Sequence, residues 1–465
     1  MSNFAFSQEP VVVPQVNSKY RRIKTEIPAP EAIPLLQKIK KYESSSMHGQ
    51  MPIVWDRAED FQVFDAWGNI WIDFTSTIFL ANAGHGNKRV VKEIRNQLDK
   101  PLLHTYSYAT EIRAQYLQYL IEATPQQFEK AFLISAGTES TEVALKLTRL
   151  RAEKINKRKP GIIGFEGNWH GRTLGAQMLS HAPDQKSWIG YLDPNIYHLA
   201  FPYPWIIEVQ KNPKKFFNKS IDRLLNEKKI NPEKDLCGMI FETFQGWGAI
   251  FYPPEFVQEA VRFAHDNGML VIFDEMQAGF GRTGTLFGYM HYNVEPDLLC
   301  CGKGASSSVP LSFVIGKKEV MDLPEIGSMS STHSANPIAC AAGLSNLKAL
   351  LEDGILDNVK HLEVIFMNKL HKIKDKYPRH IKYVEGKGLV AALIFQDTDN
   401  NPLTDICNQV CEEALRRGLL LVHTGRESIK MGPPLTIPKE ALSEGLEVLS
   451  DCIEYVINKE VSFDN

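Results

Sequence analysis

Two short apolar runs, each followed by a charged residue, constrain this chain more than any other feature. Residues 270–273 have the length and composition of a buried strand, and the carboxylate of Asp274 follows them. After a glycine-rich turn, a second apolar run at 298–301 leads to Lys303, which stands between two glycines. Ligands of open α/β sheets bind at the carboxyl ends of the strands. The pattern therefore predicts an acid and an amine close together at one edge of a sheet.

An acid–amine pair of this kind suits pyridoxal phosphate. That cofactor needs a lysine amine to form a Schiff base and an acid beside its ring nitrogen, so that the ring can accept electrons. The alternative is a buried ion pair between Lys303 and Asp274 without chemistry. Lysine is almost never fully buried without a partner, which makes it poor core material. The pair by itself leaves both interpretations open.

Composition excludes several other classes of protein. The 465 residues suggest two or three packed units, and a net charge of −3 predicts no nucleic-acid partner. The seven cysteines are scattered, without a CxxC pair or a His/Cys cluster, so we expect no metal and a reducing, cytoplasmic location. The first 19 residues lack the pattern of a signal peptide, and no apolar run is long enough for a membrane span. We therefore expect no membrane partner.

The order of apolar runs and helical patterns predicts an α/β protein with a smaller C-terminal domain. From about residue 110 onward, strand and helix patterns alternate, as in a mostly parallel sheet between helices. The run at 311–315 is predicted as a strand that reverses direction at the far edge of this sheet. Further elements are a hairpin over 63–74, helices over 31–42, 87–98, 141–155, 256–267, 339–350, 405–417 and 439–456, and strands over 132–134, 162–165, 238–241, 389–394 and 419–422.

Two turns after predicted strands carry candidate ligand contacts. A strand that turns through Gly137 and Thr138 into a helix offers backbone N–H groups to a phosphate. An ordinary strand–helix turn with a capping hydroxyl explains the same residues. In the next turn, Trp169 could stack on a planar ring and Arg172 could hold a carboxylate. Core packing and a structural ion pair are the alternatives for these two side chains.

Six motifs, in a fixed order, resemble those of one enzyme family. From about Trp67 to the C-terminus the chain is similar to the class III, or ω-type, aminotransferases of the pyridoxal-phosphate fold type I superfamily. The motifs are Ser-Ala-Gly-Thr-Glu-Ser at 135–140, Trp-His-Gly-Arg-Thr at 169–173, Asp-Glu-Met-Gln-Ala-Gly-Phe-Gly-Arg-Thr-Gly at 274–284, Cys-Gly-Lys-Gly at 301–304, Asn-Pro-Ile-Ala-Cys-Ala-Ala at 336–342 and Pro-Pro-Leu-Thr-Ile at 433–437.

The resemblance implies a function, a cofactor and a domain arrangement. The expected reaction moves an amino group between an amine or ω-amino substrate and a keto acid of the 2-oxoglutarate or pyruvate type, with pyridoxal 5′-phosphate as cofactor. The expected fold is a large domain with a mostly parallel sheet, plus a smaller α+β domain built from both ends of the chain. We expect an N-terminal arm over 1–50, the N-terminal part of the small domain and a connector over 51–100, the cofactor-binding domain over 101–345 and the C-terminal small domain over 346–465.

The resemblance also assigns roles to single residues. Lys303 would form the Schiff base and Asp274 would pair with the ring nitrogen, as the two catalytic residues. Thr332 would contact the phosphate of a partner subunit, which implies a homodimer with shared active sites. The other cofactor contacts would be Gln277 at the ring oxygen, Gly137 and Thr138 at the phosphate, Trp169 stacked on the ring with His170 after it, and Glu242, which opens a Glu-x-x-Gln-Gly segment.

The departures from the family pattern concern the substrate. Relatives that use 2-oxoglutarate with an ω-amino acid carry a second acid where this chain has Trp247, and an arginine where it has Lys430. Lysine meets a carboxylate as a point charge and not as a fork. We therefore expect Trp247 and Lys430 to contact a substrate other than plain 4-aminobutyrate or ornithine. The other expected substrate contacts are Arg172, which matches a family position that can bind a carboxylate, and Ile78. The alternative function is another reaction of the same cofactor, by an epimerase, aminomutase or ammonia-lyase.

Overall fold

The computed structural model describes residues 4–158 and 160–463, which form two compact units. The larger unit comprises Lys88–Gly246 and Ile250–Asp353. The smaller unit combines Met1–Asn87, Trp247–Ala249 and Gly354–Asn465, so both ends of the chain contribute to it. The predicted division at residues 50, 100 and 345 stays a prediction of domain boundaries.

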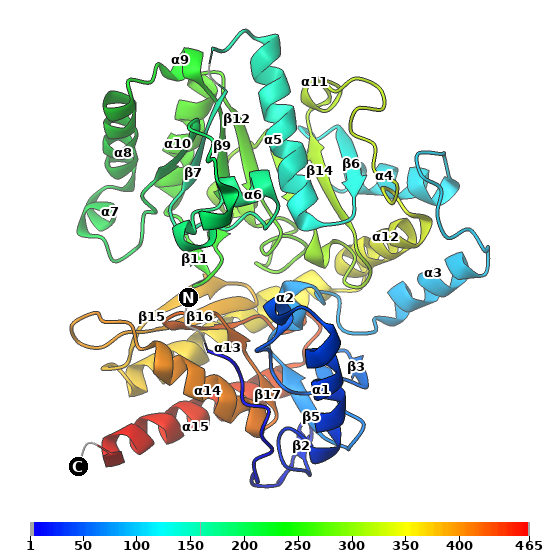
Figure 1. The fold of residues 1–465 in the computed structure, drawn as a ribbon, viewed down its shortest axis with the longest axis vertical. Coiled ribbons are helices and arrows are strands. Elements are labelled where there is room, and N and C mark those ends of the chain that lie inside the picture. The colour runs from blue at the N-terminus through cyan, green and yellow to red at the C-terminus, as the bar shows by residue number, and fades with distance from the viewer. Residues whose placement is uncertain (1–3, 159, 464–465) are drawn as a thin grey trace. The chain divides into compact units, whose positions relative to one another are not determined.

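A seven-stranded sheet forms the centre of the larger unit (Figure 1). Six of its strands run parallel, and β14 runs antiparallel to both of its neighbours. The mostly parallel sheet of the prediction is therefore confirmed. In spatial order the strands are β6 (Lys130–Ile134), β14 (Ser312–Gly316), β13 (Leu298–Cys301), β12 (Leu270–Asp274), β9 (Leu236–Glu242), β7 (Gly161–Phe165) and β8 (Ile196–Leu199).

The predicted position of the reversed strand is wrong. β14 does reverse direction, but it lies inside the sheet, between β6 and β13, and β6 and β8 are the edges. The composition of β14 fits this position, because all of its residues are buried. A short antiparallel return places β14 beside β13, and the parallel β6 then pairs with its other side.

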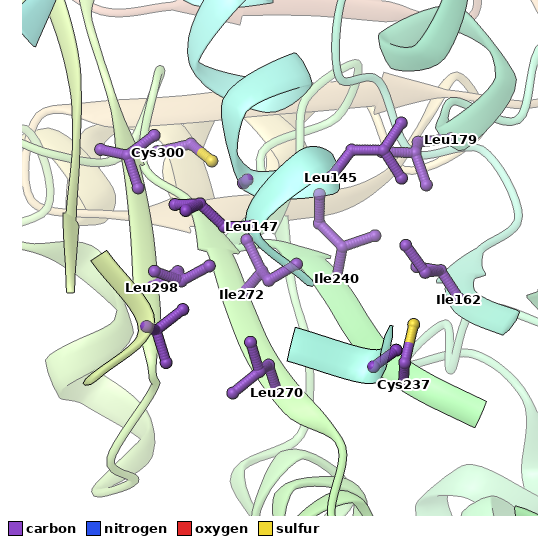
Figure 2. Close-up of a cluster of buried hydrophobic side chains, with 14 of the residues drawn as sticks. Leu145, Leu147, Ile162, Leu179, Cys237, Ile240, Leu270, Ile272, Leu298 and Cys300 are labelled. Atoms are coloured by element: carbon purple, nitrogen blue, oxygen red, sulfur yellow. The ribbon is translucent and has the colours of Figure 1, made fainter. Parts of the chain in front are cut away.

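One face of this sheet packs against helix α5 (Gly137–Lys154). Figure 2 shows Leu145 and Leu147 of α5 among Ile240, Ile272 and other buried side chains of the strands. The next residues along the strands point to the opposite face, where Phe241 and Phe273 stack with ring centroids 4.9 Å apart. Both faces are thus apolar, as expected for a covered, mostly parallel sheet.

Most of the remaining helices of the larger unit pack against the sheet or against one another. Helix α5 begins four residues before the predicted start, because the carboxylate of Glu139 accepts hydrogen bonds from the N–H groups of Ser135 and Ala136 and closes the first turn. The other helices are α3 (Lys88–Leu98), α4 (Glu111–Glu122), α6 (Leu174–Leu179), α7 (Ile207–Lys211), α8 (Pro213–Lys228), α9 (Pro232–Asp235), α10 (Pro254–Asp266), α11 (Lys318–Met321) and α12 (Pro337–Glu352).

The smaller unit contains two sheets and several helices. The predicted hairpin is confirmed, with β4 (Gln62–Phe64) antiparallel to β5 (Ile70–Asp73). The predicted strand over 419–422 divides into β17 (Leu419–Leu420), which pairs with β5, and β18 (Val422–His423), which joins the other sheet. That second sheet has the order β15 (Ile381–Lys387), β16 (Val390–Phe395), β19 (Ser428–Met431), β18, and the main helices are α1 (Ile33–Tyr42), α13 (Ile355–Lys376), α14 (Thr404–Arg416) and α15 (Lys439–Phe463).

The segment marked α2 (Ser76–Phe79) is a left-handed turn within the smaller unit. Four successive residues have positive φ, from +46° at Ser76 to +65° at Phe79, and none of them is glycine. Such a conformation costs L-residues roughly 1–2 kcal/mol each. The Oγ of Ser76 donates a 2.6 Å hydrogen bond to the carbonyl of Gly432, which helps to hold the turn.

Candidate active site

The carboxyl ends of several parallel strands meet at one pocket of about 180 Å³ in the larger unit. The pocket therefore lies where ligands of open α/β sheets bind, outside the carboxyl ends of the strands. All the residues predicted to bind the cofactor line this pocket except Thr332. They are Gly137, Thr138, Trp169, His170, Glu242, Asp274, Gln277 and Lys303.

Lys303 follows the end of β13 and lines the pocket in a strained conformation. Its φ is +43°, in the left-handed region that disfavours residues other than glycine. Burial lowers the pKa of its amine, while the nearby charges of Asp274 and Glu242 act in the opposite direction. A larger fraction of neutral amine is therefore available than for a lysine in water, as a nucleophile or a base requires.

Asp274, at the end of β12, is held by two hydrogen bonds. Its Oδ1 accepts from the backbone N–H of Met276 at 3.0 Å, and its Oδ2 lies 2.9 Å from Nδ1 of His170. Both side chains are buried. The backbone N–H of His170 donates to Ser180 Oγ at 2.7 Å, which helps to fix the histidine beside the carboxylate. An acid oriented in this way can hold a proton or a positive charge at a defined point of the pocket.

Glu242, at the end of β9, connects two loops of the pocket. Its Oε2 accepts from the N–H of Trp169 at 3.0 Å and from the N–H of Gly246 at 3.3 Å. A Cβ at Gly246 would come within 2.5 Å of Gln277 Nε2, so glycine lets the Gln277 side chain lie against this backbone. The carboxylate thus orders the loop that carries Trp169 and the backbone beside Gln277.

The N-terminus of α5 forms another wall. Gly137 and Thr138 are its first two residues, where backbone N–H groups are available to an anion. Thr138 Oγ1 accepts from the N–H of Thr173 at 3.2 Å, which ties this end of the helix to the loop after Trp169. A Cβ at Gly171 would lie 2.4 Å from Thr138 Oγ1, so the close approach of the two segments requires glycine there.

These groups fit pyridoxal 5′-phosphate. An amine with a lowered pKa suits its aldehyde, an oriented carboxylate suits its ring nitrogen, and a helix N-terminus suits its phosphate. One observation of the site itself also indicates a ligand: Nε2 of His170, which lines the pocket, is buried and has no hydrogen-bond partner in the described chain.

Comparison with known proteins agrees with this geometry. The sequence pattern of the family described as aminotransferase class-III matches residues 44–453. The chain belongs to the class-III aminotransferases. An alanine/serine racemase of Pyrococcus horikoshii is 30% identical over 98% of this chain and 97% of its own length. A 4-aminobutyrate aminotransferase of Mycobacterium leprae is 30% identical over 92% of this chain and 97% of its own length.

A solved structure supports the fold. The (S)-enantioselective omega-transaminase of Thermomicrobium roseum superposes with a TM-score of 0.84 at 24% identity, over 91% of this chain and 98% of that one. The superposition confirms the fold, and the family match confirms the resemblance to class III enzymes, the aminotransferase function and the pyridoxal-phosphate cofactor. The role of each residue stays a prediction.

In this class-III aminotransferase, two predicted residues of the larger unit, Thr332 and Arg172, do not line the pocket. Thr332 is exposed and does not line it, and exposed Arg172 places its guanidinium 4.7 Å from the centre of the Trp169 ring. The remaining predicted substrate residues belong to the smaller unit. There Trp247 lies under Arg426, Lys430 lies over Phe79, and Ile78 is 48% exposed in the left-handed turn.

Five residues that line the pocket, and Glu275 beside them, were not singled out from the sequence; the five are Gly171, Thr243, Phe244, Met276 and Ala278. Met276 lines the pocket, and a Cβ at Gly137 would come within 2.8 Å of its Sδ. Glu275, beside Asp274, is completely buried, and burial raises its pKa to about 7. It accepts hydrogen bonds from Thr243 Oγ1 and from the N–H groups of Gly288 and Tyr289. The sequence did contain a signal for Glu275 and Met276, because both lie between the predicted site residues Asp274 and Gln277.

In the part of the chain that the structure describes, no helix combines the length and apolar character that crossing a bilayer needs. Among the same residues, no three or more His, Cys, Asp or Glu side chains are grouped so that they could hold a metal ion. The seven cysteines are all free thiols, and all are buried.

Proposed function

We propose that this aminotransferase works through Lys303, taking an amino group from an amine or ω-amino substrate and giving it to a keto acid of the 2-oxoglutarate or pyruvate type. The observation that carries the proposal is that one pocket contains an amine with a lowered pKa and a carboxylate fixed by a buried histidine. A pair serving only the core would not need to line an open pocket beside a helix N-terminus.

Pyridoxal phosphate supplies an electron-accepting ring when it is bound. The residues supply position and proton transfer. Asp274, fixed by His170 and Met276, keeps a positive charge at the ring nitrogen favourable. The N-terminus of α5 would hold the phosphate, and Trp169 would offer an aromatic face to the ring. Nζ of Lys303, with its lowered pKa, would accept the proton from the amino-bearing carbon of the donor. In the second half of the reaction it would deliver a proton to the carbon of the keto acid that receives the amino group.

The smaller unit supports a substrate other than plain 4-aminobutyrate or ornithine. Trp247 stands where many relatives have an acid, and it is held in place: the Arg426 guanidinium lies 3.9 Å from its ring centre, and Ser428 Oγ donates to its carbonyl at 2.8 Å. Lys430 is 5% exposed, and its amine lies 4.7 Å from the centre of the Phe79 ring. Held in these contacts, neither residue reproduces a mobile pair of an acid and an arginine. A bulkier amine, sugar-like or aromatic, is the proposed donor.

A second candidate is racemisation or epimerisation by the same residues. Two observations favour it: both positions of the acid–arginine pair are altered, and the racemase of Pyrococcus horikoshii matches nearly the whole chain. Such a reaction needs Lys303 and Asp274 but no second, carboxylate-bearing substrate. It therefore places no demand on the positions of Trp247 and Lys430.

A half-reaction screen tests both candidates. The cofactor-loaded protein is mixed with single amines without a keto acid, and the visible absorbance is followed. Permanent bleaching, reversed by adding a keto acid, is expected for transamination. An absorbance that recovers by itself while the amine changes configuration supports the racemase. A normal specificity constant with 4-aminobutyrate and 2-oxoglutarate would contradict the proposed substrate class.

A homodimer with shared sites and a cytoplasmic location are also proposed. Thr332 is exposed and lies outside the pocket of its own chain, as a residue serving a partner's phosphate would be. Light scattering should give about twice the chain mass of 52.6 kDa, and Thr332→Asp should weaken cofactor binding by charge repulsion. Seven free, buried cysteines suit a reducing compartment, and cell fractionation tests the location.

A further inference from the structure

A side chain of a separate element, Asn346, is hydrogen-bonded to the turn that follows Lys303. Asn346 lies on α12 and is completely buried. Its Nδ2 donates to the carbonyl of Gly304 at 2.8 Å and to the carbonyl of Ala305 at 3.0 Å. An amide group has two N–H donors, and this geometry occupies both of them with consecutive peptide carbonyls.

The turn needs such support because its conformation is unfavourable. Lys303 and Ser307 both have positive φ, +43° and +52°, although neither is glycine. Within the turn, the N–H of Ala305 donates to the carbonyl of Gly302 at 2.9 Å, and Ser308 Oγ donates to the carbonyl of Ser306 at 3.0 Å. Strained residues at functional sites persist only where the surroundings over-determine them, and Asn346 supplies a tie to a separate element.

The other end of the Asn346 side chain shows that the residue is not a simple packing choice. Its Oδ1 is buried without a hydrogen-bond partner in the described chain. A buried, unsatisfied oxygen is unfavourable, and leucine would fill a similar volume without it. The feature that leucine cannot supply is the pair of N–H donors to Gly304 and Ala305.

We propose that Asn346 is a positioning residue for Lys303. It acts through the backbone, because it fixes the two peptide groups that follow Lys303. This keeps Lys303 in its left-handed conformation and keeps Nζ in the position where it can react with the cofactor and the substrate. The proposal rests on the proposed role of Lys303, and it assigns Asn346 no contact with substrate or cofactor.

The test compares Asn346→Leu with a matched control, Ser345→Ala. Ser345 is the preceding residue of α12, is 2% exposed, and donates only to the carbonyls of Ala341 and Ala342 in its own helix. Both variants remove a buried polar group, but only Asn346→Leu frees the turn. The holoenzymes are compared by thermal midpoint, by kcat and KM, and by pH titration of the visible absorbance of the cofactor bound through Lys303.

For Asn346→Leu we expect a shift of the absorbance titration by half a pH unit or more and a fall in kcat of about 10²-fold, the size of effect that a 1 Å misplacement causes, with KM changed less than threefold. Ser345→Ala should leave the midpoint of the absorbance titration unchanged and kcat within twofold of the parent value. If Asn346→Leu does the same, the proposal is overturned.

Two arrangements keep the test decisive. If Asn346→Leu does not fold, Asn346→Ser, which retains one donor, should show the same shift in smaller size; an unchanged titration in that variant also overturns the proposal. The titration needs no substrate. A parent protein that converts no amine would therefore count against the proposed function, while the titration would still decide the role of Asn346.

Discussion

The pocket of the larger unit and the Trp247–Lys430 region of the smaller unit differ in the groups that surround their positively charged side chains. In the pocket, the amine of Lys303 is influenced by two carboxylates, those of Asp274 and Glu242. In the smaller unit, Arg426 and Lys430 lie over the rings of Trp247 and Phe79. Carboxylates near an amine tune proton transfer, whereas aromatic faces hold cations in place and offer apolar surface. This difference fits the proposed division between residues that would serve the reaction and residues that would serve the choice of substrate.

The two regions also differ in their backbone. The pocket residues follow the ends of strands in one sheet, where neighbouring strands fix their positions. The residues of the second region lie on a hairpin strand, in a left-handed turn and in a three-residue excursion of the chain. Such segments accept changes of side chain more easily than a sheet edge does. Specificity can therefore change there while the chemistry stays constant.

The largest expected effect is that of Lys303→Ala. Removal of the amine should lower kcat by about 10⁴-fold or more, because the nucleophile and the proton carrier are the same group. Steady-state kinetics measure the loss, and an unchanged thermal midpoint of the cofactor-free protein shows that the fold persists. Residual activity above a tenth of the parent value would mean that the chemistry lies elsewhere.

Replacement of His170 should have a smaller effect, because it acts through Asp274. His170→Leu removes the donor at 2.9 Å and should lower kcat by about 10–100-fold, as for residues that orient a reactive group. His170→Asn can place an N–H near the position of Nδ1 and should recover most of the loss. Equal losses in the two variants would show that packing, not the hydrogen bond, matters at this position.

The double variant Trp247→Glu with Lys430→Arg tests whether the second region sets specificity. It restores the residue types of relatives that use an ω-amino acid with 2-oxoglutarate. Its specificity constant for 4-aminobutyrate should rise about tenfold or more, equivalent to roughly 1.4 kcal/mol. Each single variant is the control and should gain less, since each introduces a charge without its counterpart. No gain in the double variant would remove these positions from the account of specificity.

The last expected effect concerns stability and leaves activity unchanged. Burial raises the pKa of Glu385, on β15, from 4.5 to about 7. The Glu385 carboxyl therefore binds its proton more tightly in the folded protein than in the unfolded chain. The contribution of Glu385 to the free energy of unfolding is complete below pH 4.5 and is lost as the pH rises through 7. Glu385→Gln should remove about 1–2 kcal/mol of that decline, allowing for partial exposure.

Thermal midpoints of the parent and of Glu385→Gln, measured from pH 4.5 to 8, check this. The curves should approach each other at low pH, and the variant should be the more stable above pH 7. Exposed Glu43, in the same unit, supplies the control, and Glu43→Gln should leave the pH dependence unchanged. Parallel curves for the parent and Glu385→Gln would show that Glu385 does not titrate in this range.

The cofactor pocket was largely predictable from the sequence, for a physical reason. Asp274 follows one apolar run directly and Lys303 follows another after a single glycine, and the ends of neighbouring parallel strands lie at the same edge of a sheet. Asn346 could not be predicted in this way, because it lies inside a helix whose other buried residues are mostly apolar. Its partners are backbone carbonyls, which leave no trace in the sequence.

The internal position of β14 was not predictable from periodicity either. A run of buried residues is compatible with either direction and either place in a sheet. Its neighbours are decided by pairing: residue 134 of β6 lies opposite residue 312 of β14. The left-handed turn at Ser76–Phe79 was missed for a similar reason, since it lacks the glycines that normally signal positive φ.

The place of β14 has a consequence for how the protein is made. In the described sheet β6 pairs only with β14, which comes much later in the chain. At a synthesis rate of roughly 5–20 residues per second, β6 waits on the order of ten seconds or longer before its partner leaves the ribosome. During that time an unpaired strand is open to association with other chains. Slow, late closure of the sheet should therefore make the nascent enzyme dependent on chaperones, whatever its final stability.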